Sequence, residues 1–327
     1  MMGLPPFALA RPTELAAAIE LLRAGGPRAR LLAGGTDLLV NLKHRLHEVD
    51  TLISLEGLAE LRGLREEADG TLVLGANLKL VEVAADPRIR LRATALAEAA
   101  GEVAHPQARQ MGTLGGNVCL DVRCRWVNRS PAWRASLGGC LKSEGEVCHV
   151  VPKGKNCVAA LSGDTLPALA ALRAEAVIAG PAGERRVPVE DLRGKDGREP
   201  LTLGPGEILV SLRIPPAAPL RRSAYQKWAV RGAVDFPLVG VGLSAEVREG
   251  ATLHDIRIAV GVLGPRPKIV TGLQAYEGER ADAALGRAIA ERVCRQCTPL
   301  PNVLSDPDYR RRLLGVLVQR QIAAWGE

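Results

Sequence analysis

Gly112-Thr113-Leu114-Gly115-Gly116-Asn117 opens the segment that decides how this chain is interpreted, and Ser162-Gly163-Asp164-Thr165 closes it. Glycine lets a backbone approach a phosphate closely, because no Cβ atom stands between the amide N–H groups and the anion. The sequence therefore predicts a phosphate-binding turn at residues 112–117.

Four cysteines lie inside this segment, at spacings of 16, 8 and 9 residues: Cys124, Cys140, Cys148 and Cys157. Residues 118–160 show little helix or strand periodicity, and such a long irregular segment inside a compact domain is usually functional. Four thiolates can hold an iron–sulfur cluster or a structural zinc ion. Zinc sites usually use C-x-x-C pairs, which these four cysteines lack, so the spacing favours iron–sulfur and redox chemistry.

The other cysteines have plainer interpretations. Cys119 is predicted to be a small buried residue, with a substitute cluster ligand as the alternative. Cys294 and Cys297 form a C-x-x-C inside a predicted helix, so we expect structural helix cysteines in preference to a redox pair. His149 is either a hydrogen-bond partner of the cluster or a solvated histidine.

Composition limits the protein class. A chain of 327 residues is too long for one core and suits two or three domains. The net charge of +7 is spread without a Lys/Arg block, which predicts a solvated basic surface and no nucleic-acid binding. Pro5 and Pro6 interrupt the place of a signal-peptide core, and no apolar run is long enough for a membrane span. We therefore expect a cytoplasmic protein without membrane contact, whose clustered thiols hold metal.

A second glycine turn lies near the N-terminus. A short strand over residues 30–33 leads into Gly34-Gly35-Thr36-Asp37, and a helix is predicted from Leu38. Free amides and the helix dipole at such a turn attract an anion. Two glycine turns in one chain suit a dinucleotide pyrophosphate. The chain lacks the G-x-G-x-x-G motif of nicotinamide-binding domains, which excludes a doubly wound dehydrogenase.

Hydrophobic periodicity gives the order of elements. Helices are predicted over residues 13–25, 91–103, 166–173, 281–297 and 309–324. Strands are predicted over residues 30–33, 52–55, 72–74, 176–178, 187–189, 207–214, 238–247 and 256–262. His105-Pro106 should break a helix and lead into an irregular segment, and Pro215-Pro216 should form a linker. Mixed strands followed by terminal helices predict an α+β fold.

The two glycine motifs, with Glu207-Ile208-Leu209, Lys227 and Asp235-Phe236-Pro237, resemble the flavin-binding subunit of the molybdenum hydroxylase family, which includes xanthine and CO dehydrogenases. The resemblance covers essentially the whole chain. It implies a two-subdomain FAD-binding fold of the PCMH type over residues 1–218, divided at about residue 55, with a cysteine-rich insertion at 118–160. A C-terminal α+β domain of the CO dehydrogenase flavoprotein type would occupy residues 219–327.

The resemblance also implies the residues that contact FAD. They are Leu31, Leu32, Ala33, Gly34, Gly35, Thr36, Asp37, Leu38, Thr113, Leu114, Gly115, Gly116, Asn117, Asp164, Leu209 and Lys227. Without the resemblance, Asp164 is a candidate N-cap of the following helix and Lys227 a solvated lysine. No catalytic residue is expected in this oxidoreductase subunit, because in this family the substrate meets molybdenum on another subunit.

The insertion is similar to one subgroup, the β subunits of 4-hydroxybenzoyl-CoA reductase, where four cysteines at this spacing hold a 4Fe-4S cluster. That similarity implies an electron-transfer subunit for reductive dehydroxylation of an aromatic acyl-CoA. Its partners would be a molybdopterin subunit and a 2Fe-2S subunit, in a dimer of heterotrimers, with ferredoxin as donor. The alternatives are a xanthine or CO dehydrogenase-like FAD subunit, and a zinc-stabilised basic module that binds nucleic acid.

The insertion is also rich in basic residues. Seven of them are predicted either to dock an acidic ferredoxin or only to confer solubility. They are Arg123, Arg125, Arg129, Arg134, Lys142, Lys153 and Lys155.

Overall fold

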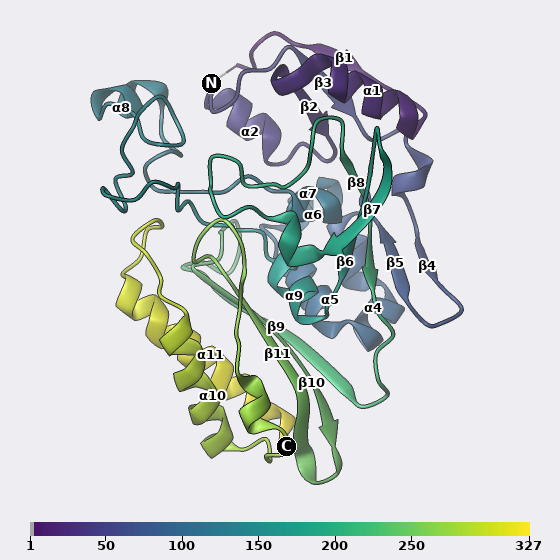
Figure 1. The fold of residues 1–327 in the computed structure, drawn as a ribbon, viewed down its shortest axis with the longest axis vertical. Coiled ribbons are helices and arrows are strands. Elements are labelled where there is room, and N and C mark those ends of the chain that lie inside the picture. Colours follow the sequence, from purple (N-terminus) through teal and green to yellow (C-terminus); the bar gives the residue numbers. More distant parts are fainter. Residues whose placement is uncertain (1–2) are drawn as a thin grey trace.

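The computed structural model describes residues 3–327, and within them three β-sheets follow one another along the chain (Figure 1). The first sheet is parallel and the other two are antiparallel. Helices pack against the sheets, which confirms the predicted α+β class.

The N-terminal sheet has the order β1-β3-β2. Its strands are β1 (Ala8–Ala10), β2 (Ala29–Leu32) and β3 (Thr51–Ser54), and they are connected by helices α1 (Leu15–Gly25) and α2 (Leu38–Lys43). Leu15, Ile19 and Leu22 form the apolar stripe of α1 and pack against the main core. The first glycine turn therefore lies at the carboxyl end of β2, before α2.

The second sheet has the order β4-β5-β8-β6-β7. Its strands are β4 (Leu64–Glu66), β5 (Leu72–Gly75), β6 (Glu175–Gly180), β7 (Gly183–Pro188) and β8 (Ile208–Ile214). Between β5 and β6 the chain forms six helices and the cysteine-rich insertion. The helices are α3 (Leu80–Ala85), α4 (Pro87–Arg92), α5 (Thr94–Gly101), α6 (Pro106–Met111), α7 (Leu114–Val118) and α9 (Thr165–Ala171).

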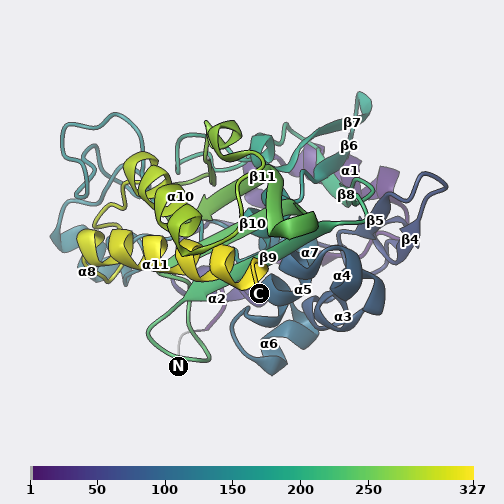
Figure 2. The same ribbon diagram turned by 90° about the horizontal axis from the view of Figure 1, so that it is seen from below.

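The third sheet has the order β12-β11-β10-β9. Its strands are β9 (Arg221–Trp228), β10 (Val239–Arg248), β11 (Thr252–Gly261) and β12 (Lys268–Ile269). Helices α10 (Ala283–Gln296) and α11 (Pro307–Trp325) cover one face, and α5 and α9 cover the other (Figures 1 and 2). Strand alternation produces this arrangement: Ala224 belongs to the core under α10 and α11, and its neighbour Tyr225 to the core under α9.

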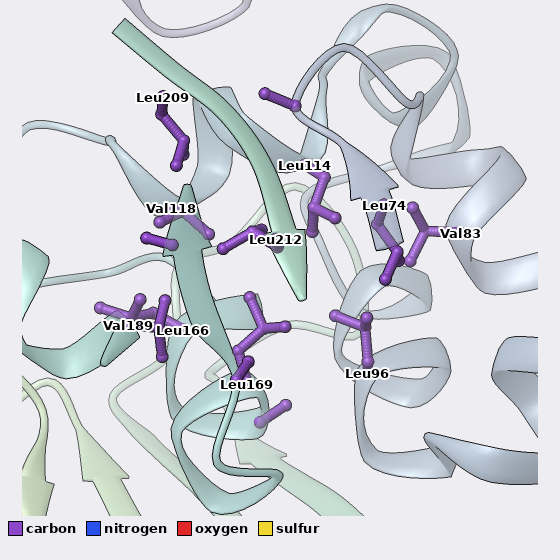
Figure 3. Packing of buried hydrophobic residues seen from close by; sticks show 14 of the residues in the cluster. Leu74, Val83, Leu96, Leu114, Val118, Leu166, Leu169, Val189, Leu209 and Leu212 are labelled. Atoms are coloured by element: carbon purple, nitrogen blue, oxygen red, sulfur yellow. The ribbon is translucent and has the colours of Figure 1, made fainter. Parts of the chain in front are cut away.

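Helix α9 approaches the third sheet very closely. A Cβ atom on Gly242 would clash with the backbone of Pro167, so only glycine fits at that position of β10. The Ser244 hydroxyl of the same strand donates to the Ala171 carbonyl over 2.7 Å. This packing brings the segment before α9 next to β9. Figure 3 shows the adjoining core, where Leu166 and Leu169 of α9 meet Leu212 of β8.

Several predictions of local structure need correction. The helix predicted over residues 91–103 is two helices, α4 and α5, because Ala93 between them has a non-helical backbone (φ −139°, ψ 48°). His105-Pro106 begins α6 where an irregular segment was predicted, since Pro106 occupies the first helical turn and the His105 ring accepts from the Ala108 amide. Residues 118–160 contain one short helix, α8 (Pro131–Ser136). The predicted boundaries near residues 55 and 218 fall after β3 and between β8 and β9, and they stay predictions.

Candidate functional site: two glycine turns and a cysteine-lined cavity

The first glycine turn has free donors. Within residues 3–327, the backbone amides of residues 34–36 donate no hydrogen bond. Gly35 has a φ of +71°, which favours glycine, and the turn is partly open to solvent. Unpaired amides that follow one another before a helix are suited to bind an anion.

The second glycine turn lies against the first. A Cβ atom on Gly34 would clash with the Met111 carbonyl, so the two turns depend on glycine to approach each other. The second turn differs from the prediction in one respect: most of its backbone amides already donate hydrogen bonds within the protein. Leu114 donates to Leu78, Gly115 to Ala76 over 2.8 Å, and Gly116 to the Thr113 hydroxyl over 3.1 Å. Gly116 is exposed, so this turn offers close approach at Gly116 instead of a row of free amides.

Asp164 and Lys227 form a buried pair. The Lys227 ammonium lies 3.3 Å from Asp164 Oδ1, and the Tyr225 hydroxyl donates to the same oxygen over 2.7 Å. Lys227 also donates to the Glu102 and Asp235 carbonyls. Burial raises the pKa of the Asp164 carboxyl to about 6, against the opposing effect of Lys227.

This pair corrects two alternatives from the sequence. Asp164 stands at the N-cap position of α9, yet its side chain makes no capping hydrogen bond. The Lys227 side chain is 6% exposed, so it is not a solvated lysine. The N-terminal end of α9 is capped instead by Asn117. Its Oδ1 accepts hydrogen bonds from the Thr165 amide and hydroxyl over 3.0 and 2.7 Å.

A groove adjoins the buried pair. It is lined by Glu102, Ala104, Lys227, Asp235 and the turn at residues 228–233. Val230, at 70% exposed, lies on this turn. The groove therefore combines an ammonium group with an apolar edge, next to a carboxyl whose pKa is raised by burial.

Some predicted FAD contacts lie in the core. Leu114 and Leu209 are buried, and Figure 3 shows both side chains within the hydrophobic cluster. Leu32 and Leu38 pack on a small core formed by Leu42, Val49 and Leu52. Leu31 and Ala33 are half-buried against the main core, and Thr36 is exposed. Their roles toward FAD stay predictions.

The four predicted ligand cysteines line one cavity. Cys124, Cys140, Cys148 and Cys157 all border it, although they are spread over 34 residues of sequence. Burial raises the pKa of Cys124 to about 11 and also raises the pKa of Cys157. Within residues 3–327, no group of three or more His, Cys, Asp or Glu side chains is arranged to hold a metal ion. The four thiols nevertheless border one cavity.

The rest of the cavity wall is mostly apolar. It is formed by Trp126, Val127, Leu141, Lys142, His149, Val150, Val158 and Ala159. The His149 ring packs on Trp126 and its Nε2 donates to the Gly139 carbonyl over 2.6 Å. His149 is therefore a half-buried wall residue and not a solvated histidine. Lys142 points its ammonium to Asp121 and to the Gly197 carbonyl, at 2.9 and 2.7 Å.

The remaining cysteines lie outside the cavity. Cys119 packs against the main core, and burial raises its pKa to about 11. Cys297 is fully buried in the third-sheet core, and Cys294 donates to the Arg311 carbonyl over 3.3 Å. These positions agree with structural roles for all three.

The basic residues of the insertion do not form one surface. Arg134 is buried, and Arg123 and Lys142 pair with Asp37 and Asp121. Four of the seven remain exposed: Arg125, Arg129, Lys153 and Lys155. The predicted docking surface is therefore reduced to these four residues.

Sequence reasoning missed Tyr225 and the contact that Arg123 makes with Asp37. Tyr225 lies two residues before Lys227 on β9, so strand periodicity places both on one face, but the sequence did not predict this strand. Arg123 contacts Asp37 from 86 residues away, and no sequence pattern indicates that contact.

Comparison with known proteins adds to this geometry. Residues 5–217 match the family described as FAD binding domain in molybdopterin dehydrogenase, and residues 223–324 match the CO dehydrogenase flavoprotein C-terminal domain. The chain is 30% identical to the carbon monoxide dehydrogenase medium chain of Hydrogenophaga pseudoflava, over 98% of each chain. It is 27% identical to the xanthine dehydrogenase FAD-binding subunit of Escherichia coli O157:H7, over 96% of this chain and 94% of the relative.

Solved structures show the same similarity. The structure of carbon monoxide dehydrogenase from Hydrogenophaga pseudoflava superposes with a TM-score of 0.80 at 27% identity, over 99% of each chain. Quinoline 2-oxidoreductase from Pseudomonas putida 86 superposes with a TM-score of 0.77 at 25% identity, over 98% of this chain and 97% of the other. Across residues 3–327, no helix has the length and apolar character needed to span a membrane.

Proposed function

This chain belongs to the FAD-binding medium subunits of the molybdenum hydroxylase family, of the xanthine and CO dehydrogenase type, and we propose that it also holds a 4Fe-4S cluster. The four cysteines that line one cavity are the observation that carries this proposal. FAD accepts electrons in pairs and a 4Fe-4S cluster transfers them singly, so the chain would exchange electrons between one- and two-electron partners.

The residues of the glycine turns fit FAD. The unpaired amides of residues 34–36 would bind the pyrophosphate, and Gly116 would allow the cofactor to approach the second turn. Lys227, held by Asp164 and two carbonyls, would keep a fixed positive charge at the groove beside it.

The cysteine cavity fits a multi-iron cluster. In such a cluster each thiolate binds a different iron, so the thiols must surround a common space. The apolar wall residues Val127, Leu141 and Ala159 would limit the access of water to the cluster, and Lys142 would place a positive charge beside the anionic ligands. Solvent exclusion and nearby charge are two of the factors by which a protein sets the reduction potential of a cluster.

Metal and flavin analysis tests the proposal against the zinc alternative. We expect the anaerobically purified chain to contain FAD, iron and acid-labile sulfide, with flavin bands over a broad brown absorption. A yellow protein with zinc and no iron would contradict the cluster, and a colourless protein would contradict both cofactors. Family membership already favours a flavoprotein over a nucleic-acid-binding module.

A 4-hydroxybenzoyl-CoA reductase-like enzyme is the second candidate, and the cysteine insertion is the observation that favours it. The relatives described above favour a xanthine or CO dehydrogenase-like hydroxylase for the main function. In either case we propose assembly with a molybdopterin subunit and a 2Fe-2S subunit, as a dimer of heterotrimers.

Direction of electron flow separates the two candidates. In a reductase, reduced ferredoxin should reduce the flavin through the insertion, and high salt should slow this reaction because Arg125, Arg129, Lys153 and Lys155 attract an acidic donor. Flavin reduction that is equally fast in the Cys148→Ser variant, at every ionic strength, would exclude the insertion as the entry point.

A further inference from the structure

We propose that Arg123 is a positioning residue that couples the cysteine cavity to the first glycine turn, so that cluster and FAD strengthen each other's binding. This inference rests on the function proposed above. The inference requires that one side chain contact both sites. It also requires that this contact form only when the cysteine insertion is well ordered.

The backbone of Arg123 belongs to the base of the insertion. Arg123 donates to the Ala160 carbonyl over 2.8 Å, and Ala160 donates back to Arg123 over 2.6 Å. Cys124 follows Arg123 directly, and Cys157 precedes Ala160 by three residues. Cys124 and Cys157 of the cavity are therefore close in sequence to this pair of hydrogen bonds. A shift of either cysteine should change the position of Arg123.

The side chain of Arg123 reaches the first glycine turn. Its Nη2 group donates to Asp37 Oδ1, and both side chains are only 20% exposed. Asp37 Oδ2 accepts from Asn41 over 2.8 Å, so the carboxylate is held between Arg123 and α2. Asp37 directly follows the unpaired amides of residues 34–36. The orientation of those amides therefore depends on the position of Asp37.

The guanidinium has few other partners. Its centre lies 4.0 Å from the centroid of the Phe236 ring, on the turn before β10. Its buried Nε has no hydrogen-bond partner within residues 3–327. Because a partly desolvated guanidinium gains most from a carboxylate in a fixed position, Asp37 determines where this side chain lies.

Other contacts attach the insertion to the same segment. His47 Nε2 lies 3.4 Å from Asp121, which also binds the cavity residue Lys142. Arg134 donates to the Arg45 carbonyl over 3.3 Å. The insertion thus rests on residues 37–47, and a contiguous set of contacts leads from the cavity to the glycine turn. Contiguous contacts of this kind can couple two sites physically.

A thermodynamic cycle measures this coupling. The dissociation constant for FAD is determined by fluorescence titration of the deflavinated full chain, in the wild type, Cys148→Ser, Arg123→Met and the double variant. In the wild type we expect loss of the cluster to weaken FAD binding about tenfold, a coupling of about 1.4 kcal/mol. In the Arg123→Met background, loss of the cluster should change the constant less than about twofold.

Matched controls separate coupling from a general loss of structure. Arg125 flanks Cys124 on the other side, is exposed and packs on Trp126, so Arg125→Met should keep the tenfold effect. Arg123→Lys retains a positive charge near Asp37 and should keep part of the tenfold effect of cluster loss on FAD binding. If Cys148→Ser changes the circular dichroism spectrum, the cluster is removed instead from wild type and Arg123→Met with an iron chelator.

The outcomes distinguish this inference from the proposed function. A wild-type chain without iron would overturn the cluster, and the inference with it. A wild-type chain with iron, in which cluster loss weakens FAD binding by the same factor with and without Arg123, would overturn the inference alone.

Discussion

The Lys227 ammonium lies 3.3 Å from the Asp164 carboxylate, and both side chains are almost completely buried although 63 residues separate them. The pair joins the start of α9 to β9, and through Lys227 it borders the groove at the turn of residues 228–233. Since burial alone would protonate the carboxyl, Lys227 and Tyr225 keep its pKa near 6 instead of higher.

The first prediction concerns the pH dependence of stability. The pKa of Asp164 is about 6 in the folded chain and 3.8 ordinarily, so the folded chain binds this proton more tightly. The resulting stabilisation is complete below about pH 4 and is lost as the pH rises to about 6. Other carboxylates titrate in the same range, so the measured quantity is the free energy of unfolding of wild type minus that of Asp164→Asn.

This difference should fall by about 2 kcal/mol between pH 4 and pH 7. Urea denaturation of both proteins at several pH values measures it. A difference that is constant with pH would show that Asp164 titrates normally.

The second prediction concerns Gly35. A valine there is strained, because φ is +71° and its Cβ would press against Leu32 and Leu39. We expect Gly35→Val to weaken FAD binding at least about tenfold, since the strain moves the free amides of residues 34–36. FAD content per chain after gel filtration is the measurement.

Gly63→Val is the matched control. Gly63 has a φ of +82° with open space around its Cβ position, far from the predicted FAD contacts in sequence. Both variants should lose about 1–3 kcal/mol of stability from the left-handed backbone, but only Gly35→Val should lose FAD. Equal FAD content in the two variants would contradict the role of the first turn.

The third prediction concerns the cysteines. Serine at Cys124, Cys140, Cys148 or Cys157 should remove most of the iron, because each thiolate is expected to bind one corner of the cluster. Cys294→Ser should retain it, since a serine hydroxyl can still donate to the Arg311 carbonyl. Iron retained in Cys140→Ser and lost in Cys294→Ser would reverse the ligand assignment.

Local patterns in the sequence predicted the parts of the site that are local. Each glycine turn is one short stretch, and the cysteine insertion is recognisable by composition alone. The contacts between these parts were not predictable, because Asp37 and Arg123 are 86 residues apart in the sequence, and Asp164 and Tyr225 meet only where α9 packs on the third sheet. Sequence spacing carries no information on such pairs.

The errors in the predicted secondary structure also arise where local sequence patterns are weak or misleading. Nothing in the sequence around Ala93 signals a helix break, yet the backbone of this buried residue leaves the helical region. Strand β9 was not assigned, since its polar residues Arg222, Ser223 and Gln226 obscure the alternation. The helix at Pro106 did carry a signal, because proline is favoured in a first helical turn and His105 can cap it.

The claim that one chain holds both FAD and a 4Fe-4S cluster is tested most directly by counting electrons. Anaerobic coulometric reduction of the purified full chain, followed by visible and EPR spectra, should take up about three electrons per chain, two at the flavin and one at the cluster. The Cys140→Ser chain should take up about two and lose the EPR signal of the reduced cluster. Uptake of about two electrons by the wild type, without that signal, would contradict the account.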